Sequence, residues 1–450
     1  MSARRCSTGR ALRPARGMAA LMMVMVMFFI MALVAAYTNR NLVFEQRTTA
    51  NSYRAERALV AADSGLDWTL SMLNGGRIDL QCRPSTTATN DDFRRRYLNR
   101  SADGAYSMVG PYNSADELFP GCVSLGANLT CICPVNGTPK PSPNVVLDWP
   151  MNGGGTAFRL RRQFPGGPSS RVGMIGADVR GCATTGSGNG SCVSDAREPS
   201  VDAIAEVRGT LGLLRAMPSR PLAALTTGGT INAAASLLNI ANDDAATGLS
   251  AHAGGAVSFL AGSQFLGPAG GTTNGLVAND GRLMPPTVAQ QFTINDRFFR
   301  GTFGMDPVLY RKQPALRQLN CAAGCTTADL VTHLNNFPQR TVWMNGNLSI
   351  DTAPAGGMLG SDAEPVMVIV TGTLSVQAAT QIVGFLYATD IQWSGAATTA
   401  MVRGALVAAN NFSATTTATI KYEQTVLDTI RLSYGSFVRA PGSWGRPNLP

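Results

Sequence analysis

The residues best suited to chemistry in this chain are its cysteines. Nine are present, but Cys6 lies in a basic N-terminal stretch, and without it the number is even. Cys182 and Cys192 flank a loop of glycine, serine and asparagine, and Cys321 and Cys325 are separated by Ala-Ala-Gly, so both spacings favour local disulfides. The remaining candidates, which can pair in several ways, are Cys82, Cys122, Cys131 and Cys133. An even set predicts disulfides in an oxidising compartment.

Metal and catalytic patterns are weak by comparison. Only His252 and His333 are present, and no Cys-x-x-Cys pair accompanies them, so zinc is not predicted. Asn242–Asp244 and Asn279–Gly281 supply oxygen ligands but do not complete a calcium-loop spacing. The chain contains no Gly-x-Ser-x-Gly, His-Glu-x-x-His or P-loop pattern. We therefore expect no cofactor and no metal.

Carboxylates in the C-terminal third are candidates for a sugar-cleaving pair. The acids between residues 342 and 414 are Asp351, Asp362, Glu364 and Asp390. Paired carboxylates for glycoside hydrolysis lie about 5 to 9.5 Å apart. No two of these acids occupy equivalent places in the repeat described below, so the sequence predicts a protein that is not an enzyme.

The net charge does not indicate a nucleic-acid partner. The 450 residues carry a formal charge of +9, from 37 Lys and Arg against 28 Asp and Glu. Five of these bases are the arginines at positions 4, 5, 10, 13 and 16, which leaves +4 for the other 433 residues. A nucleic-acid-binding domain would carry a basic stripe in its folded part.

An uncharged stretch of 20 residues runs from Met18 to Tyr37. At about 1.5 Å per residue it spans about 30 Å, the thickness of a hydrocarbon core, and the arginines before it predict a cytoplasmic N-terminus. The membrane positions include Met18, Met22, Phe28, Phe29 and Tyr37. A secretory signal peptide cleaved after Ala36 is the alternative.

The helical pattern continues past this stretch. Between residues 39 and 73 there is no proline, and Gly65 is the one glycine. An apolar stripe recurs at spacings of three and four residues, at Ala55, Leu59, Ala62, Leu66, Leu70 and Leu73. We predict a single helix from about Met18 to Leu73, with its first half in the membrane and its second half packed on an exported domain.

Two segments of this helix resemble a known family. Arg16-Gly17 before an uncharged helix is similar to a type IV prepilin leader, and residues 44–74 resemble the PilX family of minor pilins. The residues that match the family pattern are Glu45, Gln46, Arg47, Ala50, Asn51, Ala62, Gly65 and Leu66. The aromatic pair Phe298-Phe299, the Cys321/Cys325 pair and the segment ending at Trp444 also resemble PilX chains with large C-terminal regions.

The resemblance implies a non-enzymatic subunit of a type IV pilus, in the setting of pilus assembly, twitching motility and cell adhesion. Prepilin peptidase would cleave between Gly17 and Met18, and Met18 would be methylated. Partners would be major and minor pilins, the assembly platform, tip proteins and the membrane, with no nucleic acid. The chain would enter the bacterial inner membrane with a periplasmic domain and later join the extracellular pilus.

One residue departs from the family pattern, and it bears on where the subunit lies in the fibre. Major pilins carry Glu as the fifth residue of the mature chain, where it neutralises a neighbouring subunit's terminal amine, and this chain has Met22 there. Atypical minor pilins that prime or tip the fibre show the same loss. The resemblance therefore implies an initiating subunit at or near the tip.

The exported part is predicted to be β-rich, which gives an α+β fold overall. Alternating residues in 156–164, 171–182 and 200–211 predict an antiparallel meander. We divide the chain into a leader (1–17), a pilin-like helix (18–75, membrane part 18–37), a β-meander head with disulfide loops (76–215) and a C-terminal region (216–450).

The C-terminal region contains a loose repeat. Its members begin at Trp343, Val370, Tyr387 and Ala408, with offsets of about 26, 17 and 20 residues between equivalent positions. Short β segments at this period predict a parallel β-solenoid, with an earlier turn at 227–240 and an insertion at about 267–340. An irregular sandwich is the alternative fold.

A rival function uses the same features. Released after Ala36, the chain would be a secreted adhesin or binding module that uses a solenoid face. Tyr387 and Trp393 would bind a surface or a sugar if they were exposed, and would be core residues if they faced inward.

Overall fold

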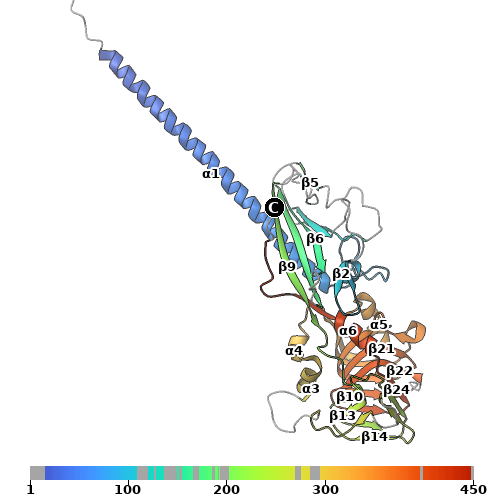
Figure 1. Ribbon diagram of the computed structural model, residues 1–450. Coiled ribbons are helices and arrows are strands. Elements are labelled where there is room, and N and C mark those ends of the chain that lie inside the picture. The colour runs from blue at the N-terminus through green and yellow to red at the C-terminus, as the bar shows by residue number, and fades with distance from the viewer. Residues whose placement is uncertain are drawn as a thin grey trace, which may run out of the picture.

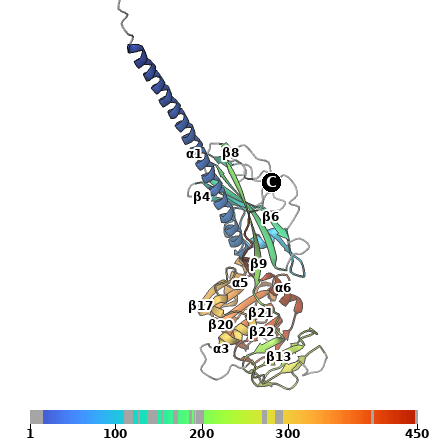
Figure 2. The same cartoon turned by 60° about the vertical axis from the view of Figure 1, so that its left-hand side comes forward.

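The computed structural model describes residues 16–108, 120–125, 128–135, 149–151, 155–165, 172–184, 188–190, 192, 202–268, 275–283, 294–395 and 399–446. A long helix leads into an antiparallel sheet, and a parallel sheet lies beyond it at the end of the molecule away from the start of the helix (Figures 1 and 2). This arrangement confirms the predicted α+β class.

The long helix is α1 (Arg16–Asn74). It is unbroken because the segment holds no proline after Arg16, and it ends where Gly75-Gly76 follows. The shorter helices are α2 (Phe93–Tyr97), α3 (Ile294–Phe303), α4 (Pro307–Tyr310), α5 (Thr327–Asn336), α6 (Gln424–Ser433) and the 3₁₀ turn η1 (Ala355–Gly357). The predicted single helix is therefore found, within about two residues at each end.

The antiparallel sheet covers the second half of α1. Its strand order is β25-β9-β7-β6-β3-β4, built from β3 (Gly121–Leu125), β4 (Asn128–Ile132), β6 (Gly155–Pro165), β7 (Met174–Thr184), β9 (Ala203–Arg215) and β25 (Gly435–Arg439). Two small pairs lie outside it, β1 (Leu98–Arg100) with β2 (Tyr106–Met108), and β5 (Trp149–Met151) with β8 (Gly188–Gly190). The meander predicted for 156–164, 171–182 and 200–211 corresponds to β6, β7 and β9.

The strand β25 lies outside this meander in sequence. It pairs with β9, Phe437 opposite Leu213, although the sequence division places it in the C-terminal region 216–450. Alternation along residues 435–439 identifies a strand but not its partner, because strand pairing is non-local. The parallel sheet is thus inserted between two neighbouring strands of the antiparallel sheet.

Four disulfides connect the described cysteines. Both predicted local bridges, Cys182–Cys192 and Cys321–Cys325, are present. The four cysteines left open pair as Cys82–Cys133 and Cys122–Cys131.

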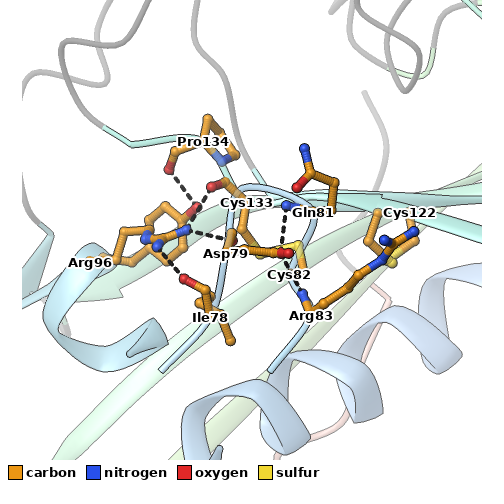
Figure 3. The surroundings of a disulfide bond; sticks show 11 residues. Ile78, Asp79, Gln81, Cys82, Arg83, Arg96, Cys122, Cys133 and Pro134 are labelled. Carbon is orange, nitrogen blue, oxygen red and sulfur yellow. Dashed lines mark hydrogen bonds between the residues drawn. A yellow bond between two sulfur atoms is a disulfide. The ribbon is translucent and has the colours of Figure 1, made fainter. Parts of the chain in front are cut away.

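The Cys82–Cys133 bridge fastens the chain that leaves α1 to the end of β4. Around it the guanidinium of Arg96 donates to the carbonyl oxygens of Ile78 at 2.7 Å and Cys133 at 2.8 Å (Figure 3). The Asp79 carboxylate accepts the backbone N–H of Gln81 and of Arg83, both at 2.8 Å. The loop after α1 is therefore held by side chains as well as by the covalent bond.

The C-terminal region forms stacked parallel strands. The stack is built from β10 (Ala223–Thr227), β11 (Ile231–Ala233), β12 (Leu238–Ala241), β13 (Leu249–Ala253), β14 (Val257–Phe259), β15 (Gln264–Leu266), β16 (Leu276–Val277), β17 (Arg317–Cys325), β18 (Val342–Ile350), β19 (Met358–Leu359), β20 (Val366–Val376), β21 (Gln381–Trp393), β22 (Met401–Ala408), β23 (Phe412–Ala414) and β24 (Ala418–Lys421). All their pairings are parallel.

The register matches the offsets in the repeat. Leu348 pairs with Leu374, 26 residues on, Leu374 with Ile391, 17 on, and Leu386 with Leu406, 20 on. The segments 401–421, 223–241 and 249–266 each contribute three strands that pair with the equivalent strands of the next segment.

The order of stacking differs from the order in the chain. The early strand β10 pairs with the late strand β22 on one side and with β13 on the other. The stack therefore runs from β17 through β22 and only then to β10, β13 and β16. The predicted insertion 267–340 also ends too late, because β17 lies inside it and pairs with β18. The polar sequence of β17 hides this strand from a pattern search.

The core of the stack is aromatic beside α3 and α4. Phe299 packs edge-on to Tyr310, Trp343 and Tyr387 at ring centroid distances of 5.4 to 5.6 Å. Tyr387 and Trp393 are both buried. The interpretation of these two residues as surface-binding aromatics is therefore wrong, and the alternative, that they are core, is confirmed.

Candidate functional site

The first half of α1 exposes an apolar surface. Met22 and Phe28 have 70% and 74% of their surfaces accessible, and the large apolar side chains from Leu21 to Tyr37 are all exposed. Burying a side chain of this size stabilises by about 1.5 to 3 kcal/mol, so a surface of this extent needs a membrane or other protein to cover it. Among the described helices, α1 alone is long and apolar enough to cross a membrane.

The polar atoms of this half are adapted to an apolar environment. The Thr38 hydroxyl donates to the carbonyl oxygens of Val34 at 2.9 Å and Ala35 at 3.0 Å, and Thr48 donates to Phe44 at 2.9 Å. A hydroxyl satisfied inside its own helix can enter hydrocarbon at little cost. The apolar surface thus extends about one turn past Tyr37 to Arg40, the first charged residue after Arg16.

The family-motif residues divide between the two halves of α1. Glu45, Gln46, Arg47 and Asn51 are exposed and Ala50 is half-buried, and within the described part of the chain Glu45 and Arg47 make no ion pair. The last three motif residues, Ala62, Gly65 and Leu66, are buried against the antiparallel sheet. The last three motif residues therefore stabilise the fold of the subunit, whereas the first five lie on a part of the helix that does not pack against the sheet.

Small residues bring the second half of α1 close to the sheet. A Cβ atom on Gly181 of β7 would lie 2.1 Å from the Ala58 carbonyl oxygen and 2.4 Å from the Ala62 nitrogen. A Cβ on Gly65 would lie 2.6 Å from the Phe158 ring. The helix and the sheet approach each other at these glycines more closely than any larger residue allows.

Two buried arginines, Arg94 and Arg340, and the half-buried Arg317 bind the C-terminal end of α1. Arg340 donates to the Gly75 carbonyl at 2.7 Å and to the Leu73 carbonyl at 3.3 Å, Arg94 donates to Leu73, and Arg317 donates to Asn74. The last carbonyl groups of a helix lack partners within the helix and carry its partial negative charge, so cations stabilise them. We call Arg94, Arg317 and Arg340 the arginine clamp.

The arginine clamp joins all three parts of the molecule. Arg94 comes from α2 beside the antiparallel sheet, whereas Arg317 comes from β17 and Arg340 lies just before β18. Arg340 and its partner Asp92 are fully buried with 3.5 Å between them. Burial lowers the pKa of Arg94, and burial together with the nearby Arg340 lowers the pKa of Arg317 to about 10. The Arg317 guanidinium therefore remains cationic at neutral pH.

Asn74 and the C-terminal segment complete the attachment. The Asn74 amide donates to the Phe437 carbonyl at 2.9 Å and accepts the Phe437 N–H at 2.8 Å, as a neighbouring strand would. On the outer side of α1, Asp63 accepts from Arg439 at 3.3 Å and from the Trp444 indole at 3.2 Å. The chain thus returns from the parallel sheet to the helix.

The comparisons with known proteins concern the helix. Residues 16–67 match the family model described as PilX N-terminal. Over these residues the helix is similar to the N-terminal segment of PilX proteins. The match covers most of α1 and confirms the resemblance predicted from the leader and motif residues over this PilX-type segment. The rest of the chain lies outside the match.

The other comparisons add little. The crystal structure of the competence-associated pilin ComZ from Thermus thermophilus is similar at 10% identity over 88% of this chain and 97% of that chain, with a TM-score of 0.19. A likeness this distant carries no argument about the β regions behind the PilX-type helix. No curated protein matches the chain.

The other predicted site residues are scattered. Gly17 and Met18 lie in the first turns of α1. Each C-terminal acid has its own neighbour: Asp351 accepts from Thr327 at 3.1 Å, Asp362 pairs with Arg403 at 3.0 Å, Glu364 pairs with Arg95, and Asp390 accepts from Asn411 at 3.1 Å. Among the described residues, no group of three or more His, Cys, Asp or Glu could hold a metal ion.

Sequence reasoning missed the arginine clamp. Arg94 lies more than 200 residues before Arg317 and Arg340, and nothing in the local sequence of the three distinguishes them from other arginines. The one available signal was that a helix ending in Asn-Gly-Gly before a folded domain leaves carbonyl groups that need buried donors.

Proposed function

We propose that the protein is a minor subunit of a type IV pilus that promotes initiation of the fibre and stands at or near its tip. The observation that carries this proposal is the exposed apolar half of α1, which is attached to a rigid head. Such a helix is suited to leave the membrane and pack sideways against the helices of other pilins.

Processing would follow the prepilin route. Prepilin peptidase would cleave after Gly17, the new terminus at Met18 would be methylated, and the assembly platform would extract the subunit from the inner membrane. The helix continues without a break through Ala36 and Tyr37 into the head. Cleavage after Ala36 would discard the apolar surface, so the unbroken helix supports cleavage at Gly17.

The shape of the molecule supports the tip position. The parallel sheet projects beyond the antiparallel sheet, away from the N-terminal end of α1 (Figure 1). In a fibre that is extended from the membrane, subunits added earlier lie farther from the membrane, which is the side toward which the parallel sheet projects. The first subunit has no earlier subunit beyond it, so the space that its parallel sheet needs is free. Met22 stands in the place of the usual glutamate. This would also suit a first subunit, because no earlier subunit is present whose terminal amine the glutamate would neutralise.

Two substitutions distinguish the prepilin route from secretion. Gly17→Asp should block processing and piliation, whereas Ala36→Leu, which removes a small residue from the signal-peptidase site and keeps the helix apolar, should leave both unchanged. N-terminal sequencing of the mature protein should begin at Met18. A mature terminus at Tyr37, or normal pili with Gly17→Asp, would overturn the proposal in favour of the secreted adhesin.

Position in the fibre needs its own measurement. Immunogold labelling of the parallel sheet should mark pilus ends, and deletion of the gene should reduce the number of pili more than their length. Even labelling along the shaft would contradict the tip position while leaving the pilin role intact.

A further inference from the structure

A pocket of about 470 Å³ is lined by residues of β10, β13, β22 and α3. These elements lie at the end of the molecule far from the start of α1 (Figure 1). The floor of the pocket is a row of three residues in register on neighbouring strands, Val407 of β22, Thr226 of β10 and His252 of β13. The helix α3 contributes Arg297 and Phe298 to one wall. No step of the proposed pilin function uses this pocket.

The ionisable side chains in its described lining are all basic. They are Arg220, Arg282, Arg297 and His252. The rest of the lining is largely apolar, with the hydroxyl groups of Ser219, Thr226 and Thr302 among it. A pocket of this size with a few placed polar groups on apolar walls is typical of a small-molecule site.

Carboxylates behind the lining hold these cations in place. Arg282 donates to both oxygens of Asp280, each at 2.9 Å, and the second oxygen also contacts the His252 Nε2 at 2.8 Å. The hydrogen bonds from Arg282 and then His252 keep the pKa of Asp280 well below its usual range, so this carboxylate stays ionised at neutral pH. A fixed guanidinium loses little side-chain entropy when it binds an anion.

Arg220 is held in the same way from the other side. Its two terminal nitrogens lie 3.3 Å from Asp428 and 3.7 Å from Asp244. Because these two carboxylates offset the positive charge of Arg220, the lining suits one negative charge better than the two of a phosphate. The hydroxyl groups and the Phe298 ring suit a flat, partly polar ring beside that charge.

We propose that this pocket binds a small ring compound with one carboxylate, of monosaccharide size. Arg282 and Arg220 would bind the carboxylate, and Phe298 would pack against the ring. Such carboxylates occur in acidic sugars and in aromatic acids. The proposal does not depend on the pilin function, since either a pilus tip or a secreted protein would expose this end of the molecule.

The test is calorimetric titration of the purified full chain in detergent with four probes. D-galacturonate should bind saturably and at least about tenfold more tightly than D-galactose, which has the same ring without the charge, because its carboxylate adds charge-assisted hydrogen bonds to the arginines. Benzoate distinguishes an aromatic acid from an acidic sugar as the source of the carboxylate. Inorganic phosphate should bind more weakly than the tighter of the two carboxylates.

Variants then assign the residues. Arg282→Gln should weaken binding of the carboxylate about tenfold or more, and so should Arg220→Gln, while the exposed Arg311→Gln outside the pocket should bind as the unmodified chain does. The Arg282 side chain is 89% exposed, so its loss should not affect folding, which thermal unfolding would check. Equal binding of galactose and galacturonate, tighter binding of phosphate, no binding of any probe, or equal losses with Arg282→Gln and Arg311→Gln would overturn the proposal.

Discussion

The two halves of α1 have opposite relations to their own chain. Residues 58–74 pack on the antiparallel sheet through Gly65 and Gly181 and end in the arginine clamp, whereas residues 19–49 are exposed throughout. Both halves are apolar, so hydrophobicity alone does not separate them. The two halves differ in what covers them. Small residues and buried hydrogen-bond donors fit residues 58–74 to their own subunit, whereas residues 19–49 need a membrane or other helices to cover them.

Because only the second half of α1 is attached to the β regions, a force that pulls on the helix is transmitted to the parallel sheet through that half. The arginine clamp binds the helix end from both β regions, and two chain crossings, one before β10 and one before β25, link the sheets. We therefore expect the head and the parallel sheet to move with α1 as one body. The following substitutions test which residues attach α1 to the two β regions and how much each contributes.

One of the two largest effects, similar in size to that of the arginine clamp below, is expected from Gly181→Val. The side chain would collide with the backbone of α1 at Ala58 and Ala62, so the helix would have to leave the sheet, at a cost of about 3 kcal/mol or more. Gly212→Val on the neighbouring strand β9 is the matched control, because a Cβ there meets nothing within 4 Å and valine favours strands. Thermal unfolding followed by circular dichroism should show a large loss with the first variant alone. Equal losses would mean that close approach of the helix is unimportant.

The next effect concerns the arginine clamp. Arg340→Gln leaves Asp92 buried without its cation and the Gly75 carbonyl without a strong donor, which should destabilise by about 3 to 5 kcal/mol. Denaturant titration would measure the loss.

The control for that experiment is an exposed pair from the same segment. Arg95→Gln removes the ion pair with Glu364, which also links α2 to the parallel-sheet region, but both side chains are about one-third accessible. Its loss should cost at most about 1 kcal/mol. If the two variants behaved alike, the buried position of the clamp would not be what matters.

The sequence predicted the parts of the molecule that depend on local pattern. The α1 stripe at three- and four-residue spacings, the strands β6, β7 and β9, and the offsets between stacked segments could all be found from the spacing of apolar residues. The membrane-length stretch and the PilX-type motif followed from the same residues, and the motif gave the link to a family.

What the sequence could not predict depends on contacts between distant segments. Alternation in 435–439 indicates a strand, but its pairing with β9 is set by tertiary packing. The stacking of β10 on β22 reverses chain order for the same reason. The arginine clamp and the basic pocket bring together side chains from unrelated segments, and only the fold shows that Arg220, His252 and Arg282 meet.

A smaller effect is expected at the outer contact of α1. Asp63→Asn weakens the bonds to Arg439 and the Trp444 indole, both in partly exposed places, so the loss should be at most about 1 kcal/mol. Because salt screens exposed charges, the difference should shrink further at about 1 M salt. Unfolding in low and high salt would measure it. A loss as large as that of Arg340→Gln would show that the C-terminal segment, and not the clamp, is the main attachment.

The smallest effect on the isolated subunit should come from Phe29→Asn, although it alters a large apolar residue. Phe29 is exposed and contacts no other part of the described chain, so the free energy of unfolding of the head should change by no more than about 0.5 kcal/mol. The matched control is Leu66→Asn on the buried half of the same helix, which should cost about 3 kcal/mol or more, because it removes a core side chain and buries an amide. Partitioning into membranes should respond in the opposite order, falling with Phe29→Asn and not with Leu66→Asn, as vesicle flotation would measure. If Phe29→Asn destabilised the head instead, the first half of α1 would have a partner within its own subunit, and the division between the two halves would fail.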